Sequence, residues 1–391
     1  MSRQARLLAI AFFESFATML LERGVYFYSH ERLGFSDVAN LALAFGFGAA
    51  YAVGALTSHA VTRRASEKRV LLFALVGQLV AFAVLVVWHG PWAVAVLNVV
   101  IGYLVGTKWP VVESYVGAGE TPSDQARTIG RFNVAWAGAI PPCLVVAGPL
   151  IAWRAEGLFV AALALSSVSL ALAWPLERRP VHLPHDHPER PLRGQMARLR
   201  GLLASSRWSM LSSYSLIWIL AALMPGIFAD LKVPLVYATA LAGLLDVFRL
   251  TAFALLWKWP GWHGRAWPLA VVVVGLPAGF FLAVSATNLP MILAGELVFG
   301  LSAGMTYFAS LYYGMVVKNA AVEAGGAHEG LIGAGFAVGP AAGLIGRQLA
   351  PALGGAVWGM AVGVGPVVAV CSVGAVASLV RVRRHPRAGL P

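Results

Sequence analysis

Residues 92–117 read WAVAVLNVVIGYLVGTKWPVVESYVG, an apolar run whose only charged residues are Lys108 and Glu113. In a helix, about 20 apolar residues cross the hydrocarbon core of a bilayer, so this run is long enough to span a membrane. A charged side chain at that depth costs a few kcal/mol. The run therefore predicts a transmembrane helix, and its two charges need a partner, contact with water, or a function.

The whole chain has a composition similar to that of this run. Of its 391 residues, 59% are hydrophobic and only 12% are charged, which is about half the charged fraction of a typical soluble protein. We therefore expect an all-α membrane protein rather than a soluble multi-domain enzyme. Cys143 and Cys371 both lie in apolar segments, where we predict buried thiols rather than a disulfide or a metal site.

Eleven further apolar segments are candidates for membrane-spanning helices. The twelve predicted spans are residues 6–28, 38–61, 69–88, 92–117, 130–153, 157–176, 209–229, 235–258, 267–286, 291–317, 329–350 and 356–380. The longest polar interruption is the connector 177–208, which carries seven arginines. Its arginine-rich second part is a candidate for a short amphipathic helix on the membrane surface.

The basic residues are distributed unevenly between the two sides of this topology. With the N-terminus in the cytoplasm, 22 lysines and arginines fall on the inner side and 4 on the outer side. Because cytoplasmic loops carry the excess of Lys and Arg, we predict a multi-pass cell-membrane protein, in a bacterial inner membrane or plasma membrane, with both termini cytoplasmic. Topology then explains the net charge of +12. We expect membrane lipids as neighbours, no nucleic-acid partner, and a monomer.

The two halves of the chain repeat. Residues 102–115 read GYLVGTKWPVVESY and residues 300–313 read GLSAGMTYFASLYY, with two glycines and the final tyrosine at a constant offset of 198. The repeat predicts two pseudo-symmetric six-helix bundles, residues 1–176 and 209–391, joined by the connector 177–208. Duplicated membrane proteins of this kind place a solute site near the bilayer midplane, where the halves meet.

The loop between the second and third spans carries a partial family motif. Gly54, Leu56 and basic pairs at 63–64 and 68–69 are present, and Ser58 stands where the motif has an acid. With the twelve-span layout, the chain resembles the major facilitator superfamily. The resemblance implies the major facilitator fold, transport of a small-molecule substrate by alternating access, no enzyme activity and no cofactor. The sequence shows no phosphate loop that would indicate ATP-driven transport.

The charges inside the spans show a second resemblance. Residues 22–28 read ERGVYFY, Lys108 lies in the fourth span, and Glu296 lies in a Gly-Glu-Leu sequence of the tenth span. This layout is similar to that of proton-coupled oligopeptide transporters, although Gly24 replaces a phenylalanine of their first-helix pattern and Met19 replaces an earlier glutamate. The resemblance implies a peptide-like or otherwise zwitterionic solute.

Physical chemistry supports a coupling role for these charges independently of the family. Removal from water favours the neutral form of a carboxylic acid, so Glu22, Glu296 and Glu14 are predicted proton carriers. Arg23 and Lys108 are predicted to hold an anionic group of the solute. If the anionic group of the solute bound Arg23 or Lys108, that base would attract the neighbouring carboxylate less strongly. Proton binding and solute binding would then be coupled.

Six further side chains are predicted to line the solute site. They come from spans that would surround the cavity: Tyr26, Trp109, Asn133, Trp136, Tyr307 and Tyr312. An aromatic wall suits amphipathic or cationic solutes.

Three other intramembrane charges are predicted to be structural. Asp246 and Arg249 lie three residues apart on the eighth span, a spacing that allows an ion pair within one helix. Glu113 lies near the cytoplasmic end of its span, where it can pair with Arg127 or Arg131 of the next loop.

We therefore predict a secondary active transporter of a small polar or zwitterionic solute, coupled to protons by symport or antiport. One alternative is a proton-driven exporter of amphipathic or cationic compounds. An alternative of another class is a membrane sensor or structural protein that transports nothing. We predict no functional metal site, because the connector histidines at positions 182, 185 and 187 form a short polar cluster suited only to adventitious metal binding.

Overall fold

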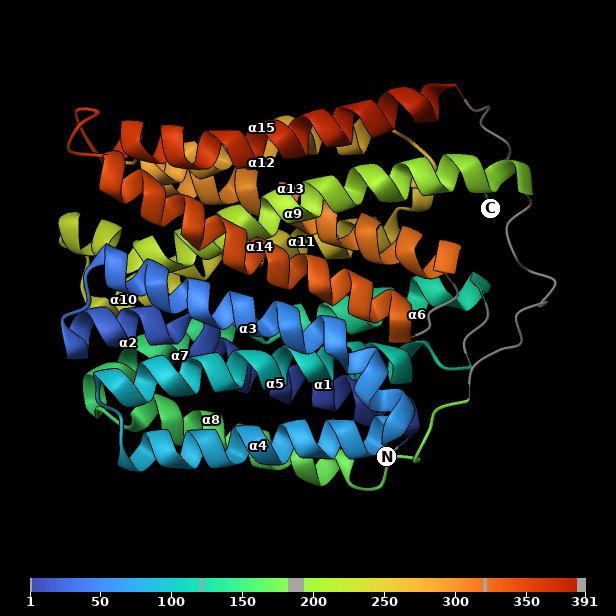
Figure 1. The fold of residues 1–391 in the computed structure, drawn as a ribbon, viewed down its shortest axis with the longest axis horizontal. Helices are drawn as coiled ribbons and strands as arrows, with labels where there is room; N and C mark the ends of the chain where they lie inside the picture. Colours follow the sequence, from blue (N-terminus) through green and yellow to red (C-terminus); the bar gives the residue numbers. More distant parts are fainter. Residues whose placement is uncertain (1, 120–121, 182–192, 319–321, 385–391) are drawn as a thin grey trace.

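The computed structural model describes residues 2–119, 122–181, 193–318 and 322–384, and within these ranges it is built of helices without a strand (Figure 1). The connector histidines lie outside the described residues. The first six predicted spans correspond to α1 (Arg3–Glu22) with α2 (Gly24–Leu33), α3 (Asp37–Arg64), α4 (Glu67–Val87), α5 (Pro91–Gly117), α6 (Pro122–Gly138) with α7 (Ile140–Trp153), and α8 (Gly157–Ala173).

The last six predicted spans correspond to α9 (Arg193–Asp230), α10 (Leu235–Ala242) with α11 (Leu244–Lys258), α12 (Trp267–Val284), α13 (Leu289–Lys318), α14 (Val322–Leu349) and α15 (Ala356–Arg383). Among the described residues, 11 helical segments are long and apolar enough to cross a membrane, and α8 is a shorter apolar helix. Hydropathy therefore located every span, because each one needs a long apolar surface toward lipid or toward its neighbours.

Two helix breaks place charged residues in the interior. Arg23 lies between α1 and α2, with φ of −124°, and Gly243 separates α10 from α11 just before Asp246. Broken membrane helices are tolerated where the freed backbone groups find partners inside the protein. Here the guanidinium of Arg23 donates to the carbonyl oxygen of Ala242 at 3.4 Å. The break between α1 and α2 thus supplies the guanidinium donor, and the break between α10 and α11 supplies the carbonyl acceptor.

Two predicted boundaries were wrong. The arginine-rich part of the connector is not a separate surface helix, because from Arg193 onward it belongs to the 38-residue helix α9. Buried Arg198 holds this extension in place by donating to the carbonyl oxygens of Gly264 at 2.8 Å and Val382 at 3.1 Å. The eleventh span begins at Val322 rather than at residue 329, so the polar residues that precede 329 lie inside a helix.

The two halves of the molecule touch at both ends of the interior. At one end α3 packs along α14 (Figure 1), with an ion pair between Asp37 and Arg347. At the other end α5 approaches α14, and α6 approaches α11 so closely that a Cβ on Gly130 would lie 2.6 Å from the Trp257 ring. The structure therefore represents a closed conformation.

The α3–α14 contact depends on a glycine. A Cβ on Gly48 would lie 2.2 Å from the backbone carbon of Phe336, which cannot move aside like a side chain. We predict that Gly48→Ala lowers stability by about 1–3 kcal/mol, as overpacking does elsewhere. Thermal unfolding in detergent measures the change. Gly365→Ala is the matched control, because nothing lies within 4 Å of a Cβ there. Equal unfolding temperatures for the two variants would contradict the prediction.

Candidate functional site

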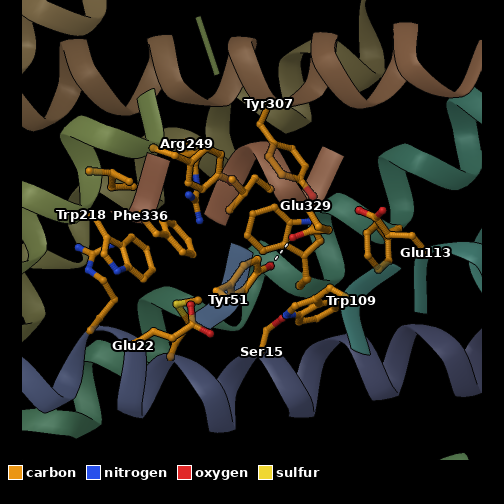
Figure 2. A pocket seen from close by; sticks show the side chains of 17 residues that line it. Ser15, Glu22, Tyr51, Trp109, Glu113, Trp218, Arg249, Tyr307, Glu329 and Phe336 are labelled. Carbon is orange, nitrogen blue, oxygen red and sulfur yellow. Dashed lines mark hydrogen bonds between the residues drawn. The ribbon is translucent and has the colours of Figure 1, made fainter. Parts of the chain in front are cut away.

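A cavity lies between the halves, with walls from both of them (Figure 2). It is lined by Ser15, Met19, Glu22, Arg23, Tyr51, Trp109, Glu113, Phe132, Trp136, Tyr214, Ile217, Trp218, Arg249, Tyr307, Glu329, Ile332 and Phe336. The cavity has a volume of about 60 Å³, which is room for a few waters. A solute of metabolite size can enter only after the walls move apart.

The basic end of the cavity is a three-residue ion-pair network. Asp246 Oδ2 lies 3.0 Å from Arg23 Nη1, and Asp246 Oδ1 lies 3.0 Å from Arg249 Nη2. The expected Asp246–Arg249 pair is thus present, but it is not insulated, because Arg23 from the other half joins it. One carboxylate shared by two guanidiniums leaves one excess positive charge. This end of the cavity therefore attracts anions.

Arg249 is held in a defined position at this end. Its guanidinium carbon lies 4.9 Å from the centre of the Trp136 ring, a distance at which the face of an aromatic ring attracts a cation. Trp136 Nε1 in turn donates to Asn133 Oδ1 at 3.1 Å. Of the predicted polar residues, Asn133 thus orients a wall residue and does not line the cavity itself.

Glu22 lines the cavity and is only 2% exposed, and its Oε1 has no hydrogen-bond partner among the described residues. The Glu22 carboxyl also lies within electrostatic range of Lys108 and Arg23. Its neighbour Arg23 is engaged by Asp246. Glu22 and Arg23, adjacent in the chain, therefore both line the cavity.

Glu113 and Glu329 form the acidic end of the cavity (Figure 2). The Tyr51 hydroxyl donates to Glu329 Oε2, whereas neither oxygen of Glu113 has a partner among the described residues. The expected pairing of Glu113 with the next loop does not occur. Arg127 pairs with Asp124 at 3.6 Å and Arg131 donates to Gln4 at 3.4 Å, because both arginines lie on the exposed face of α6 while Glu113 faces inward.

Lys108 and Glu14 lie behind the cavity wall rather than in it. They form a buried ion pair within the N-terminal half, where Lys108 Nζ also donates to Gln78 Oε1 at 2.8 Å and Glu14 Oε2 accepts from Ser166 at 3.4 Å. Lys108 Nζ lies 5.6 Å from the ring centre of the wall residue Trp109, and Lys108 is within electrostatic range of Glu22, which lines the cavity. The structure therefore does not bring Lys108 together with Arg23.

Glu296 also lies outside the lining residues. It is fully buried in α13, and neither carboxylate oxygen has a partner among the described residues. It remains within electrostatic range of Arg23 and Asp246. The charges of Arg23 and Asp246 therefore act on Glu296, although Glu296 does not line the cavity.

The aromatic wall is larger than expected. Trp109, Trp136 and Tyr307 line the cavity as predicted, whereas Tyr26 and Tyr312 do not. Tyr312 instead stacks on His263, with ring centres 4.4 Å apart. The unpredicted wall residues are Tyr51, Phe132, Tyr214, Trp218 and Phe336. Aromatic residues facing lipid and facing a cavity look alike in a sequence, so no signal separated these five.

Solved structures with a similar fold are transporters. The nucleoside transporter NupG aligns with a TM-score of 0.65 at 12% identity, over 97% of this chain and 99% of that one. The human organic anion transporter MFSD10 (TETRAN) aligns with a TM-score of 0.65 at 14% identity, over 96% of this chain and 100% of that one. A bacterial homologue of the human lysosomal transporter Spinster aligns with a TM-score of 0.62 at 13% identity, over 98% of this chain and 97% of that one.

At these identities the structural likeness establishes the fold alone. No curated protein sequence matches the chain. The family model described as Major Facilitator Superfamily matches residues 7–344. The match confirms two predictions, the twelve-helix fold of two six-helix bundles and a transporter rather than an enzyme. The chain belongs to the major facilitator superfamily.

Proposed function

We propose that this protein is a proton-coupled secondary transporter of a small zwitterionic solute that carries a flat apolar group. The observation that carries the proposal is the separation of charge in the cavity. Arg249, which shares Asp246 with Arg23, lies at one end. Glu113 and Glu329 lie toward the other end, and aromatic rings fill the space between (Figure 2). A zwitterion matches both ends at once.

The anionic group of the solute binds at the basic end. Asp246 already lies 3.0 Å from one Nη atom of each guanidinium. Arg249 Nε is buried and has no partner among the described residues. A solute carboxylate can take this donor, and charge-assisted hydrogen bonds to arginine are among the strongest available to it.

The proton is carried by Glu22. Glu22 is buried in the closed cavity, which favours the neutral acid, while the nearby Lys108 and Arg23 favour the carboxylate. Rearrangement of Arg23 toward a solute or back toward Asp246 changes the electrostatic potential at the neighbouring Glu22. Proton release and solute release are thereby linked through adjacent residues. Glu296 and Glu14 act in this scheme from behind the wall, Glu296 through its interaction with Arg23 and Glu14 as the fixed partner of Lys108.

Three structural assignments accompany the proposal. The bundles comprise residues 1–176 and 209–391, and the connector lies between them on the cytoplasmic side. Both termini are cytoplasmic, in a bacterial inner membrane or plasma membrane, as the excess of 22 over 4 bases supports. The protein works as a monomer, because its cavity is formed within one chain.

A ligand screen with an arginine variant tests the solute class. We predict that zwitterions with an aromatic side group raise the unfolding temperature of the protein, because a bound ligand stabilises the folded state. Arg249→Gln should weaken that binding by at least about 30-fold, since truncating one partner of a buried charge pair costs about 2–5 kcal/mol. Thermal shift titration in detergent measures both effects.

Arg154→Gln is the matched control for the screen. Arg154 also lies 4.9 Å from a tryptophan ring, that of Trp153, but its side chain is 61% exposed and it does not line the cavity. This control should bind like the wild type. Equal affinities of Arg249→Gln and the wild type would exclude the basic end as the solute site.

The main alternative is an exporter of amphipathic cations. Eight aromatic residues and the three acids Glu22, Glu113 and Glu329 line the cavity, and aromatic faces and carboxylates both attract organic cations. The same screen separates the two proposals, because an organic cation without a carboxylate would be insensitive to Arg249→Gln. A non-transporting sensor would bind a solute and yet give no flux in proteoliposomes.

A further inference from the structure

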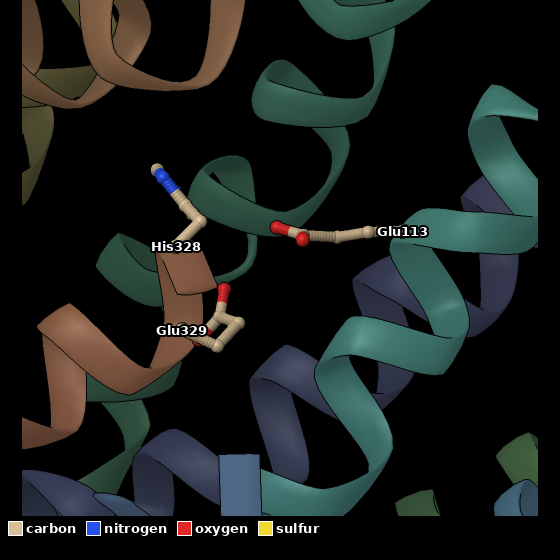
Figure 3. A group of neighbouring side chains, drawn as sticks. All are labelled: Glu113, His328 and Glu329. Carbon is tan, nitrogen blue, oxygen red and sulfur yellow. The ribbon is translucent and has the colours of Figure 1, made fainter. Parts of the chain in front are cut away.

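Glu113 of α5 meets His328 and Glu329 of α14 at the acidic end of the cavity (Figure 3). One potential ligand atom from each of the three residues lies within 4.8 Å of the other two. The Glu113 carboxylate points from its helix toward the other two side chains (Figure 3). All three residues are buried, with exposed fractions of 3% or 4%.

The cluster is short of positive charge and of hydrogen-bond donors. The Glu113 carboxyl lies against that of Glu329, and neither its oxygens nor the Nε2 atom of His328 receives a hydrogen bond from a donor outside the cluster among the described residues. Among the described residues neither carboxylate forms an ion pair, and the one base within electrostatic range of His328 there, Arg207, pairs with neither acid. Two ionised carboxylates here need a counter-charge of +2, because uncompensated charges inside a membrane protein are expensive.

A glycine lets the Glu113 carboxylate pack closely against α14 beside the other two ligands. Gly325 lies one turn before Glu329 on α14, and a Cβ there would lie 2.7 Å from Glu113 Oε2. Any other residue at 325 would push the Glu113 carboxylate away. On the far side, Ser310 Oγ lies 3.5 Å from His328 Nδ1, which helps to fix the orientation of the imidazole ring.

We propose that Glu113, His328 and Glu329 bind one divalent cation of the Zn²⁺ type. An imidazole with two carboxylates is a ligand set that suits Zn²⁺ and similar transition metals, whereas Mg²⁺ and Ca²⁺ prefer oxygen ligands alone. Zinc ligands lie about 2.0–2.2 Å from the ion, so the three groups need to close by less than about 1 Å. Water or the solute completes the coordination shell from the cavity.

The bound ion would join the two halves of the protein. Glu113 belongs to the N-terminal half and the other two ligands to the C-terminal half, so an ion held by all three stabilises the closed conformation. It would also occupy the end of the cavity proposed above for the cationic group of the solute. Metal binding itself does not depend on that proposal, because the ligands need neither a solute nor a proton gradient.

Calorimetric titration of the purified full-length protein with ZnCl2 and MgCl2 tests the site. The titration uses a chain without an affinity tag that carries His182→Ala, His185→Ala and His187→Ala, which removes the histidines of the connector. We expect one Zn²⁺ per chain and much weaker Mg²⁺ binding. Glu113→Gln, Glu329→Gln and His328→Phe should each raise the Kd for Zn²⁺ by ~10-fold or more, since loss of even an outer-shell partner costs 10–100-fold.

Glu296→Gln is the matched control, because Glu296 is another buried carboxylate without a partner among the described residues and lies on a different helix. It should leave the Kd for Zn²⁺ unchanged. If a variant does not fold, X-ray absorption at the zinc edge can be measured on the protein with Glu113, His328 and Glu329 intact. The spectrum should show one imidazole among oxygen ligands. The proposal is overturned if no saturable Zn²⁺ site is found, if the three variants bind like Glu296→Gln, or if the spectrum shows several imidazoles or a sulfur ligand.

Discussion

Glu22→Gln will abolish proton-driven accumulation of the solute in proteoliposomes. A gradient of two pH units is worth about 2.7 kcal/mol per proton, which at one proton per solute supports up to ~100-fold accumulation. Glutamine has the size of glutamic acid but cannot release a proton, so the accumulation ratio should fall to about one. Flux of labelled solute under gradients of both polarities gives the ratio and separates symport from antiport.

Solute exchange is the internal control for this variant. Glu22→Gln resembles the protonated residue, so exchange between labelled and unlabelled solute without a gradient should persist. Glu156→Gln is the matched variant, because Glu156 pairs with Arg154 at 3.6 Å near the surface and should accumulate solute like the wild type. Full accumulation by Glu22→Gln would exclude Glu22 as the proton carrier.

Lys108→Met will destabilise the folded protein strongly, more than Gly48→Ala does. Lys108 is 0% exposed and pairs with Glu14, which is 1% exposed. Removal of one partner leaves a buried charge uncompensated, which costs about 3–5 kcal/mol in other proteins. Denaturation in detergent followed by tryptophan fluorescence measures the loss of stability.

The double variant Glu14→Gln/Lys108→Met separates an ion pair from a packing effect. Removal of both charges should restore most of the stability, because no uncompensated charge remains. Arg154→Met is the surface control and should change stability little, since exposed pairs contribute little. A Lys108→Met variant as stable as the wild type would show that the ion pair is not needed to hold the N-terminal half together.

The fold followed from the sequence because each span must present a long apolar surface. The hydropathy of the runs located all twelve helices or helix pairs, and the offset of 198 between residues 102–115 and 300–313 indicated the duplication. The breaks beside Arg23 and Gly243 carried no such signal. They depend on contacts between distant segments, such as the hydrogen bond from Arg23 to Ala242.

The site was predicted only in part, because a span gives the depth of a residue but not the direction in which it faces. The repeat correctly placed Lys108 and Glu296 on equivalent helices, yet Lys108 faces Glu14 inside its own half. Sequence reasoning missed His328 and Glu329 because hydropathy begins the eleventh span at residue 329, where a glutamate resembles a helix end. The small residues from Gly325 to Ala327 fit a tightly packed helix and were the available signal.

Simultaneous recording of solute and proton movement tests the central claim most directly. Proteoliposomes that contain a pH-sensitive dye receive the zwitterion selected by the thermal shift screen, with no imposed pH gradient. We predict an internal pH change that starts when the solute is added, scales with its flux, and is absent in Glu22→Gln. Solute flux without any pH change in the wild-type protein would contradict proton coupling and with it the role proposed for the cavity charges.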